Sequence, residues 1–391
     1  MELTNVKVGT SARADVADHQ IRLRFFDRDV IIRSDSPAYI DLFARMYSRF
    51  QLDAETAANP SSAAFAIWTR PDNPWGEPVL DLNGEIWPLE PEHTGQGYIY
   101  DSILGAIVAG VRSHFLIHAG VVSWWGRGVI LAGDSGHGKT TLVLELVRRG
   151  FKFLSDEMAA LNRAERRVDP FPRCLRVQPG SLDLAGWPAA NGSIPEWYGK
   201  LLLDIETLQP NSLGVPAAIS HIIMLKDPAA PPESSLIKPG QELCILVNRL
   251  DEALLTDVKQ VEGVSRVGPD VVRGYPAIRC RAIQRMSVLA RIEALCRQHG
   301  VLILDISKRL ETRPAFDTPA RLLPLTKSQT VVELLRQFQG GHKSALLQEE
   351  FGGSSPRLFL ELAGLIGQAQ CHKLCVGSLH QAADLICSLI Q

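Results

Sequence analysis

The sequence has no excess of charge of either sign, because 41 basic residues stand against 43 acidic ones, for a net charge of −2. A balance this close argues against nucleic acid or an anionic membrane as a partner. Long apolar runs are also missing: no stretch approaches 18 uninterrupted apolar residues, and residues 1–7 contain no signal-peptide core. We therefore expect a cytoplasmic protein with no membrane-bound part.

A disulfide framework is not indicated either, since seven cysteines in 391 residues is an odd number that fits reduced thiols. Cys371, His372 and Cys375 lack a second ligand pair at zinc spacing, so the pattern favours helix packing over a metal site. Hydrophobic content of 46% and charged content of 21% describe an ordinary globular protein with ample core. The length allows two or three domains.

The most informative pattern that is present is a match to the phosphate-loop motif G-x-x-x-x-G-K-[ST]. Its glycines let backbone N–H groups surround an anion, and the helix that follows directs its positive end at the same phosphates. The lysine adds a full charge on the β and γ oxygens, and the hydroxyl after it serves Mg²⁺. The motif with its following residue predicts binding of ATP through Gly133, Asp134, Ser135, Gly136, His137, Gly138, Lys139, Thr140 and Thr141.

The residues on either side of the motif provide the context that it requires. Residues 129–132 form a short apolar run suited to a buried strand, and residues 140–149 predict a helix that ends at Gly150. Within the loop, His137 occupies a variable position, so we expect its side chain to face outward without a role.

A pair of acids is the candidate for the metal and for the catalytic base. Asp156 and Glu157 follow a predicted strand at 151–155, 17 and 18 residues after Lys139, and a helix plus a return strand covers that separation. One acid could accept the proton of a hydroxyl while the other assists the metal. The alternative is a solvated acidic turn.

A histidine precedes the loop on a neighbouring strand. His118 lies in a strand predicted at 115–125, and a hairpin at 126–128 folds this strand against the one that leads to Gly133. His118 can thereby approach the acidic pair and exchange protons with a carboxylate. The alternative is a histidine that only fills the core.

Together these features closely resemble the catalytic core of bacterial HPr kinase/phosphorylase. The resemblance covers residues 115–161 and includes the His118 strand, the hairpin, the loop, the helix ending in glycine and the acidic pair, although Ala119 interrupts the family's histidine-glycine step. It implies an α/β fold like that of phosphoenolpyruvate carboxykinase, with a mixed sheet. It also implies that Asp156 is the general base, that His118 supports its proton exchange, and that Thr140 with Asp156 or Glu157 holds Mg²⁺.

The sequence departs from that family downstream of the acids. The family's LEIRGLG-like signature is missing, and the segment 170–176 instead resembles a proline-phenylalanine-proline-arginine segment of divergent HPr-kinase-related kinases. Arg173 and Arg176 could relieve charge on the transferring phosphoryl group or bind an anionic substrate. Both could equally be surface arginines.

The organisation predicted along the chain has three parts. Residues 1–100 form a small α+β lobe with strands at 21–26 and 30–33, a helix at 38–50 and a loop-rich stretch at 68–91. Residues 101–280 form the catalytic domain, with a helix at 100–113, apolar segments at 222–225 and 243–250 and a proline-rich insert at 228–232. Residues 281–391 are mostly helical, with helices at 281–298, 358–367 and 379–390, a short strand at 301–306, and a capping box at Thr326 and Gln329 that opens a helix through 338.

The function that these patterns favour is an ATP-dependent kinase that phosphorylates a hydroxyl, a serine or threonine of a peptide or protein. A small-molecule acceptor stays open, because a fold does not determine a substrate. A nucleotide-binding switch or scaffold without a dedicated acceptor is the alternative of a different class. Residues 340–343 could be an exposed loop of a partner-docking module, with a solvated loop as the alternative. The oligomeric state stays open, a homo-oligomer included.

Overall fold

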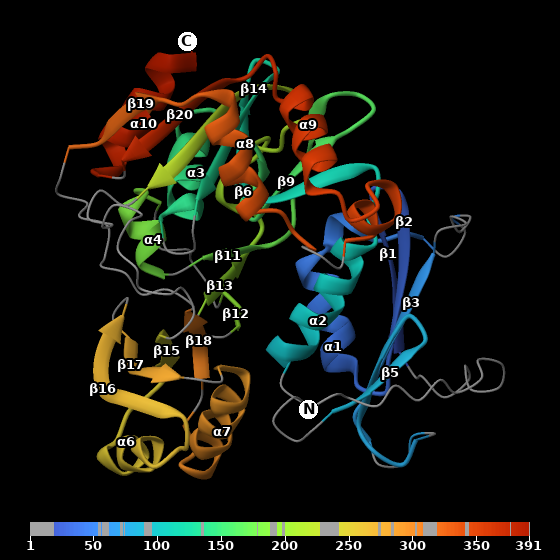
Figure 1. Cartoon of the computed structure of the whole chain (residues 1–391), viewed down its shortest axis with the longest axis vertical. Helices are drawn as coiled ribbons and strands as arrows, with labels where there is room; N and C mark the ends of the chain where they lie inside the picture. The colour runs from blue at the N-terminus through green and yellow to red at the C-terminus, as the bar shows by residue number, and fades with distance from the viewer. Residues whose placement is uncertain are drawn as a thin grey trace.

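The computed structural model describes most of the chain (Figure 1). The described residues are 19–53, 56, 62–70, 73, 75–89, 96–133, 137–177, 179–187, 194–197, 200–226, 242–272, 275–282, 285–301, 303–307, 319–340, 344–375 and 377–390. The expected insert at 228–232 and residues 341–343 lie outside these ranges. Among the described residues, no helix has the length and apolar character needed to cross a bilayer.

The N-terminal lobe is a sheet with helices on one side. The strand order is β1-β2-β3-β4-β5, with β1 (His19–Phe25), β2 (Arg28–Ser34), β3 (Ala63–Trp68), β4 (Val79–Leu82) and β5 (Glu85–Pro88). The two predicted strands form the β1–β2 hairpin. The helix predicted at 38–50 is α1 (Pro37–Met46) followed by the 3₁₀ turn η1 (Ser48–Phe50). The stretch expected to be loop-rich contains β4 and β5, and the helix expected at 100–113 is α2 (Gln96–Ala109).

The central sheet carries the phosphate loop. Its order is β10-β9-β6-β7-β14-β20-β19, and β8 pairs with β6 beside β9. Strands β7, β14 and β20 run parallel, whereas β6 is antiparallel to β7, β8 and β9. The strands are β6 (His114–Trp124), β7 (Arg127–Gly133), β8 (Lys152–Ser155), β9 (Met158–Asn162), β10 (Arg167–Asp169), β14 (Ala217–Lys226), β19 (Arg321–Pro324) and β20 (Gln370–Cys375). The sheet is therefore mixed, as expected.

Helices cover both faces of this sheet (Figure 1). Apolar side chains of α3 (Lys139–Arg148), α4 (Pro179–Leu184) and α10 (Leu379–Ile390) pack with those of β7, β14 and β20 on one face. On the other face lie α8 (Lys327–Arg336), the π-helical turn η4 (Leu346–Glu350) and α9 (Ser355–Leu365). The capping box predicted at Thr326 and Gln329 is present at the start of α8.

A separate small unit follows β14. The order of its elements is β15 (Glu242–Val247), α6 (Glu252–Lys259), β16 (Val264–Val272), β17 (Tyr275–Ala282), α7 (Arg285–Gln298) and β18 (Ile303–Ser307). Its sheet order β16-β17-β15-β18 gives the ferredoxin-like βαββαβ arrangement. Its apolar core contains side chains of α6 and α7 and is separate from the other cores.

A minor sheet links the lobe to the central sheet. Its order is β11-β13-β12, with β11 (Leu175–Val177), β12 (Glu196–Trp197) and β13 (Lys200–Leu203), and the short helix α5 (Ile205–Leu208) follows. Trp197 and Leu202 of this sheet share one apolar core with the N-terminal lobe and with Leu116 and Met158 of the central sheet. The lobe is therefore packed onto the central sheet.

The predicted boundary at residue 281 does not follow the sheets. It separates β18 from its partner β15, and it separates β19 and β20 from the central sheet that they complete. The described part of residues 281–391 is mostly helical, as expected, but it is not a separate extension, because its strands complete sheets that begin earlier in the chain. These pairings join segments far apart in sequence, which a local hydrophobic pattern does not report.

Candidate functional site

The phosphate loop lies between β7 and α3, in the strand-loop-helix context that the sequence predicts. Asp134, Ser135 and Gly136 lie outside the described residues. Gly138 precedes α3 with φ at +78°, a left-handed conformation that favours glycine, and its carbonyl accepts a hydrogen bond from the amide of Leu142 at 2.8 Å. A Cβ added to Gly133 would lie 2.8 Å from the carbonyl oxygen of Leu225, so this glycine permits close approach to β14.

The side chains of the loop are partly held by backbone carbonyls. Lys139 is buried, and its Nζ donates to the Gly133 carbonyl at 2.7 Å, which leaves further N–H donors of the ammonium group for an anion. His137 does not point outward as expected, because it is half-buried and its Nδ1 lies 3.2 Å from the Leu225 carbonyl. Thr140 and Thr141 are half-buried in the first turn of α3.

The acidic pair lies next to the start of this loop. The amide of Ala119 on β6 donates to the Glu157 carbonyl at 3.1 Å, and Ala119 pairs with Ala132 on β7. Glu157 is therefore level with Ala132, the residue before Gly133, and β6 lies between them. At the usual strand separation this is roughly 10 Å between backbones. Side chains and a bound phosphate group can span such a distance.

The two acids form a cluster of four side chains with Arg173 and His118. Arg173 places its Nη2 2.7 Å from Oε2 of Glu157 and its Nε 3.6 Å from Oδ1 of Asp156. His118 places its Nδ1 3.2 Å from Oε1 of Glu157. Asp156 is 2% exposed and Arg173 is 5% exposed, whereas the side chain of Glu157 is 39% exposed. Glu157 is therefore the acid that faces solvent.

The two carboxyl groups differ in protonation chemistry. Burial raises the pKa of Asp156, and the negative charge of Glu157 adds to this effect, against the opposing charge of Arg173. Burial also acts to raise the pKa of Glu157, but the charge of Arg173 and the hydrogen bond with His118 outweigh it and hold that pKa well below its ordinary value. One acid is thus kept ionised while its neighbour binds a proton more readily, which is the separation that acid–base chemistry uses.

The proline-bounded segment before β11 positions Arg173. The amide of Phe171 donates to the Leu154 carbonyl at 2.8 Å, which lays the segment along the end of β8. The ring of Phe171 packs among the lobe's aromatic rings, 4.9 Å from that of Phe50. The amide of Cys174 then donates to the Met46 carbonyl at 2.8 Å. The lobe therefore fixes both sides of Arg173.

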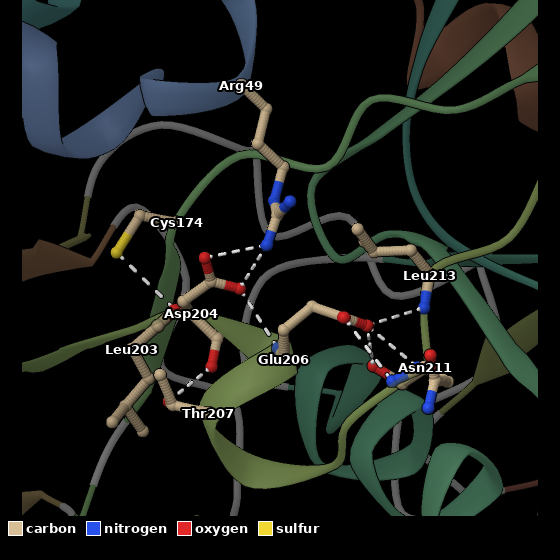
Figure 2. Close-up of polar contacts among 9 residues, drawn as sticks. Arg49, Cys174, Leu203, Asp204, Glu206, Thr207, Asn211 and Leu213 are labelled. Carbon is tan, nitrogen blue, oxygen red and sulfur yellow. Dashed lines mark hydrogen bonds and ion pairs between the residues drawn. The ribbon is translucent and has the colours of Figure 1, made fainter.

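Figure 2 shows a second connection between lobe and sheet at the same place. The Sγ of Cys174 lies 3.4 Å from the Leu203 carbonyl, and Arg49 of the lobe reaches both carboxylate oxygens of Asp204 at 2.7 Å. Glu206 accepts backbone hydrogen bonds from the 211–213 turn, including that of Leu213 at 3.0 Å. These contacts tie the segment carrying Arg173 to the minor sheet.

The structure gives His118, Arg173 and Arg176 specific partners. His118 contacts Glu157, whereas the resemblance implied support of Asp156. Arg173 is neither a surface arginine nor directed at open space, because it is buried against both acids. The guanidinium of Arg176 lies over the ring of Trp197 at 4.3 Å. The role of the N-terminal lobe in positioning Arg173 was not predicted from the sequence. The aromatic residue Phe171, which stands between two prolines, could have indicated a packing contact for this segment.

No cluster of three or more histidine, cysteine or acidic side chains arranged for a metal exists among the described residues. Mg²⁺ does not require such a cluster, since it binds through one or two carboxylates with water and phosphate oxygens. The Oδ1 of Asp156 is buried and makes no hydrogen bond with the described part of the chain. This oxygen and the solvent-facing Glu157 fit the donor set that Mg²⁺ prefers.

The chain is similar to several curated proteins named HPr kinase/phosphorylase. It is 24% identical over 174 residues to the protein of Limosilactobacillus reuteri, which is 41% of this chain and 52% of that one. It is 24% identical over 142 residues to the protein of Geobacillus thermodenitrificans, which is 34% of this chain and 45% of that one. It is 29% identical over 96 residues to the protein of Clostridium tetani, which is 24% of this chain and 29% of that one. No profile of a known protein family matches the chain.

A comparison with solved structures finds the HPr(Ser) kinase/phosphatase of Coxiella burnetii, 16% identical, covering 47% of this chain and 95% of that one with a TM-score of 0.21. The chain spans about half or less of the length of the curated relatives named above. The sequence matches support a divergent HPr-kinase-like family.

Proposed function

We propose that this protein is an ATP-dependent phosphotransferase that moves the γ-phosphoryl group to a hydroxyl, the serine or threonine of a peptide or protein. The observation that carries the proposal is the placement of Asp156 and Glu157 level with the end of β7, where the phosphate loop begins. Phosphoryl transfer needs a set of groups that bind the phosphates, a metal, a base and relief of charge. We assign residues at these strand ends to each of the four roles.

The division of work follows from the two protonation states. Asp156 has a raised pKa, and its buried Oδ1 makes no hydrogen bond with the described part of the chain, so this carboxylate is suited to accept the proton of the attacking hydroxyl. Glu157 stays ionised beside Arg173 and His118, so with Thr140 it would hold Mg²⁺. When bound, Mg²⁺ would neutralise charge on the phosphate oxygens. Lys139 and the N-terminus of α3 stabilise the same oxygens.

Access to the base sets a condition on this mechanism. Because Asp156 is 2% exposed, an acceptor hydroxyl reaches its carboxylate only after neighbouring side chains move. Arg173 is buried and contacts both acids, so the role that we assign to it is positioning of the two carboxylates.

A partition experiment with γ-labelled ATP tests the proposed function. The purified protein is incubated with labelled ATP, Mg²⁺ and a library of serine- and threonine-containing peptides. We expect label to move from ATP to peptide. Label that appears only as inorganic phosphate, at a rate that peptides do not change, would favour the nucleotide switch, and label transferred to small hydroxyl compounds alone would favour the small-molecule kinase.

A further inference from the structure

A pocket of about 210 Å³ opens directly beside the phosphate loop. One wall comes from the loop and the first turn of α3, through Gly138, Thr141 and Leu142. The facing wall comes from the C-terminal part of the chain, through Leu374 of β20 and Leu379 and Ala382 of α10. The pocket therefore joins segments that lie more than two hundred residues apart in sequence.

The chemistry of the walls selects an uncharged, largely apolar group. Leucine and alanine side chains dominate the lining, while Ser378 and the imidazoles of His137 and His380 supply polar atoms. Ligand pockets commonly combine apolar walls with such a small number of polar groups. The described residues that line the pocket include no buried lysine or arginine that could bind a second phosphate or another anion. The phosphate loop suits the phosphates of a ligand, and the pocket suits an uncharged part of the same ligand.

The C-terminal wall is held firmly against α3. Glu145 of α3 is fully buried and accepts hydrogen bonds from Arg148 and Arg149, while Nδ1 of His380 lies 3.1 Å from its Oε1. Arg149 also pairs with Asp384 of α10 at 2.5 Å. Because the contacts of His380 with Glu145 and of Asp384 with Arg149 cross between the two helices, the pocket is formed before any ligand arrives.

From this arrangement we infer that the pocket binds the purine base of the nucleotide whose phosphates occupy the loop. The start of α10 is then part of the nucleotide site, and the C-terminal region takes part in substrate binding as well as in the fold. This inference rests on the proposed function, because it takes the loop's ligand to be a nucleoside triphosphate.

Two pairs of variants test the inference, with ATP and inorganic tripolyphosphate as probes in calorimetric titrations. Ser378→Phe fills the pocket, and Ser354→Phe is its control, since Ser354 is a half-buried serine directly before α9. Leu184→Asn makes an exposed part of the pocket's rim polar, and Leu360→Asn changes an exposed leucine on α9. Tripolyphosphate reports the loop alone, whereas ATP reports the loop and the pocket.

We expect Ser378→Phe to weaken ATP binding about tenfold or more, which is about 1.4 kcal/mol, and to leave tripolyphosphate binding unchanged. Leu184→Asn should weaken ATP binding by a smaller factor, and neither control should change it. Unchanged ATP affinity in Ser378→Phe overturns the inference. If Ser378→Phe also loses tripolyphosphate binding, the substitution has disturbed the phosphate loop, and the result for Leu184→Asn is used instead. Unchanged ATP affinity in Leu184→Asn would then overturn the inference. Failure of the unaltered protein to bind either probe overturns the proposed function.

Discussion

His118 and Glu157 meet across neighbouring strands, with Nδ1 of the histidine 3.2 Å from Oε1 of the glutamate. Asp156, the neighbouring acid, lies beside Arg173, whose Nε is 3.6 Å from its Oδ1. The two acids have opposite properties, since the charge of Arg173 and the hydrogen bond with His118 hold Glu157 ionised, whereas burial shifts Asp156 toward the protonated form. This difference underlies the roles proposed for them.

Lys139→Ala should abolish nucleotide binding, because the loop loses the charge that meets the β and γ phosphates. Thermal or chemical unfolding with and without ATP measures this. At an ATP concentration of about 100 times Kd, the unaltered protein should gain about 2.7 kcal/mol of stability, and the variant should gain none. Lys152→Ala changes an exposed lysine at the start of β8 and should keep the gain. Equal gains in Lys139→Ala and in the unaltered protein would contradict the assignment of the loop.

Arg173→Met should lower the free energy of unfolding by about 3–5 kcal/mol, because it leaves a buried carboxylate without its counter-charge. Urea denaturation gives the value. Arg336→Met, which changes an arginine with a 56% exposed side chain on α8, should stay within about 0.5 kcal/mol. Adding Asp156→Asn to Arg173→Met should recover part of the loss. A double variant no more stable than the single one would show that the buried pair is not the cause.

The structure supports some of the sequence predictions for clear physical reasons. The strand before the motif, the helix after it and the capping box at Thr326 depend on residues within a few positions of one another, so a local pattern reports them. A local pattern does not report the pairing of β20 with β14, because apolar and polar residues alternate poorly over 370–375 and the partner strand lies about 150 positions earlier. The partner of His118 was likewise undecided, since spacing brings it near both acids and only the register shows that it contacts Glu157.

The contact between α3 and α10 should make stability depend on acid pH. Burial acts to raise the pKa of Glu145, but hydrogen bonds from Arg148, Arg149 and His380 outweigh it and lower the pKa from 4.5 to about 2. Because the folded-state pKa lies below the unfolded one, this carboxylate contributes stability above about pH 4.5 that is lost as the pH falls toward 2. The contribution is at most roughly 3 kcal/mol. Denaturation of Glu145→Gln across this range should lack that part of the pH dependence, and an identical profile would contradict the prediction.

The βαββαβ unit should be removable without unfolding the central sheet. Cys244 near the start of β15 pairs with Ser307 at the end of β18, so the two ends of the unit lie side by side and a short glycine-serine linker can join them. Replacing residues 242–307 in this way should leave a cooperatively unfolding protein that binds ATP. Ending the chain at residue 318 removes strands β19 and β20 and helices α8, α9 and α10, with η4, from the central fold and should abolish folding. Loss of folding in the first variant would show that the unit supports the sheet.

The measurement that tests the central claim most directly compares phosphoryl transfer in Asp156→Asn and Glu157→Gln, with ATP affinity determined in the same preparations. The account predicts that Asp156→Asn keeps ATP bound and loses transfer to the acceptor by about 10²–10⁴-fold, the range for removal of a positioned base. Transfer by Asp156→Asn at the rate of the unaltered protein would contradict the account.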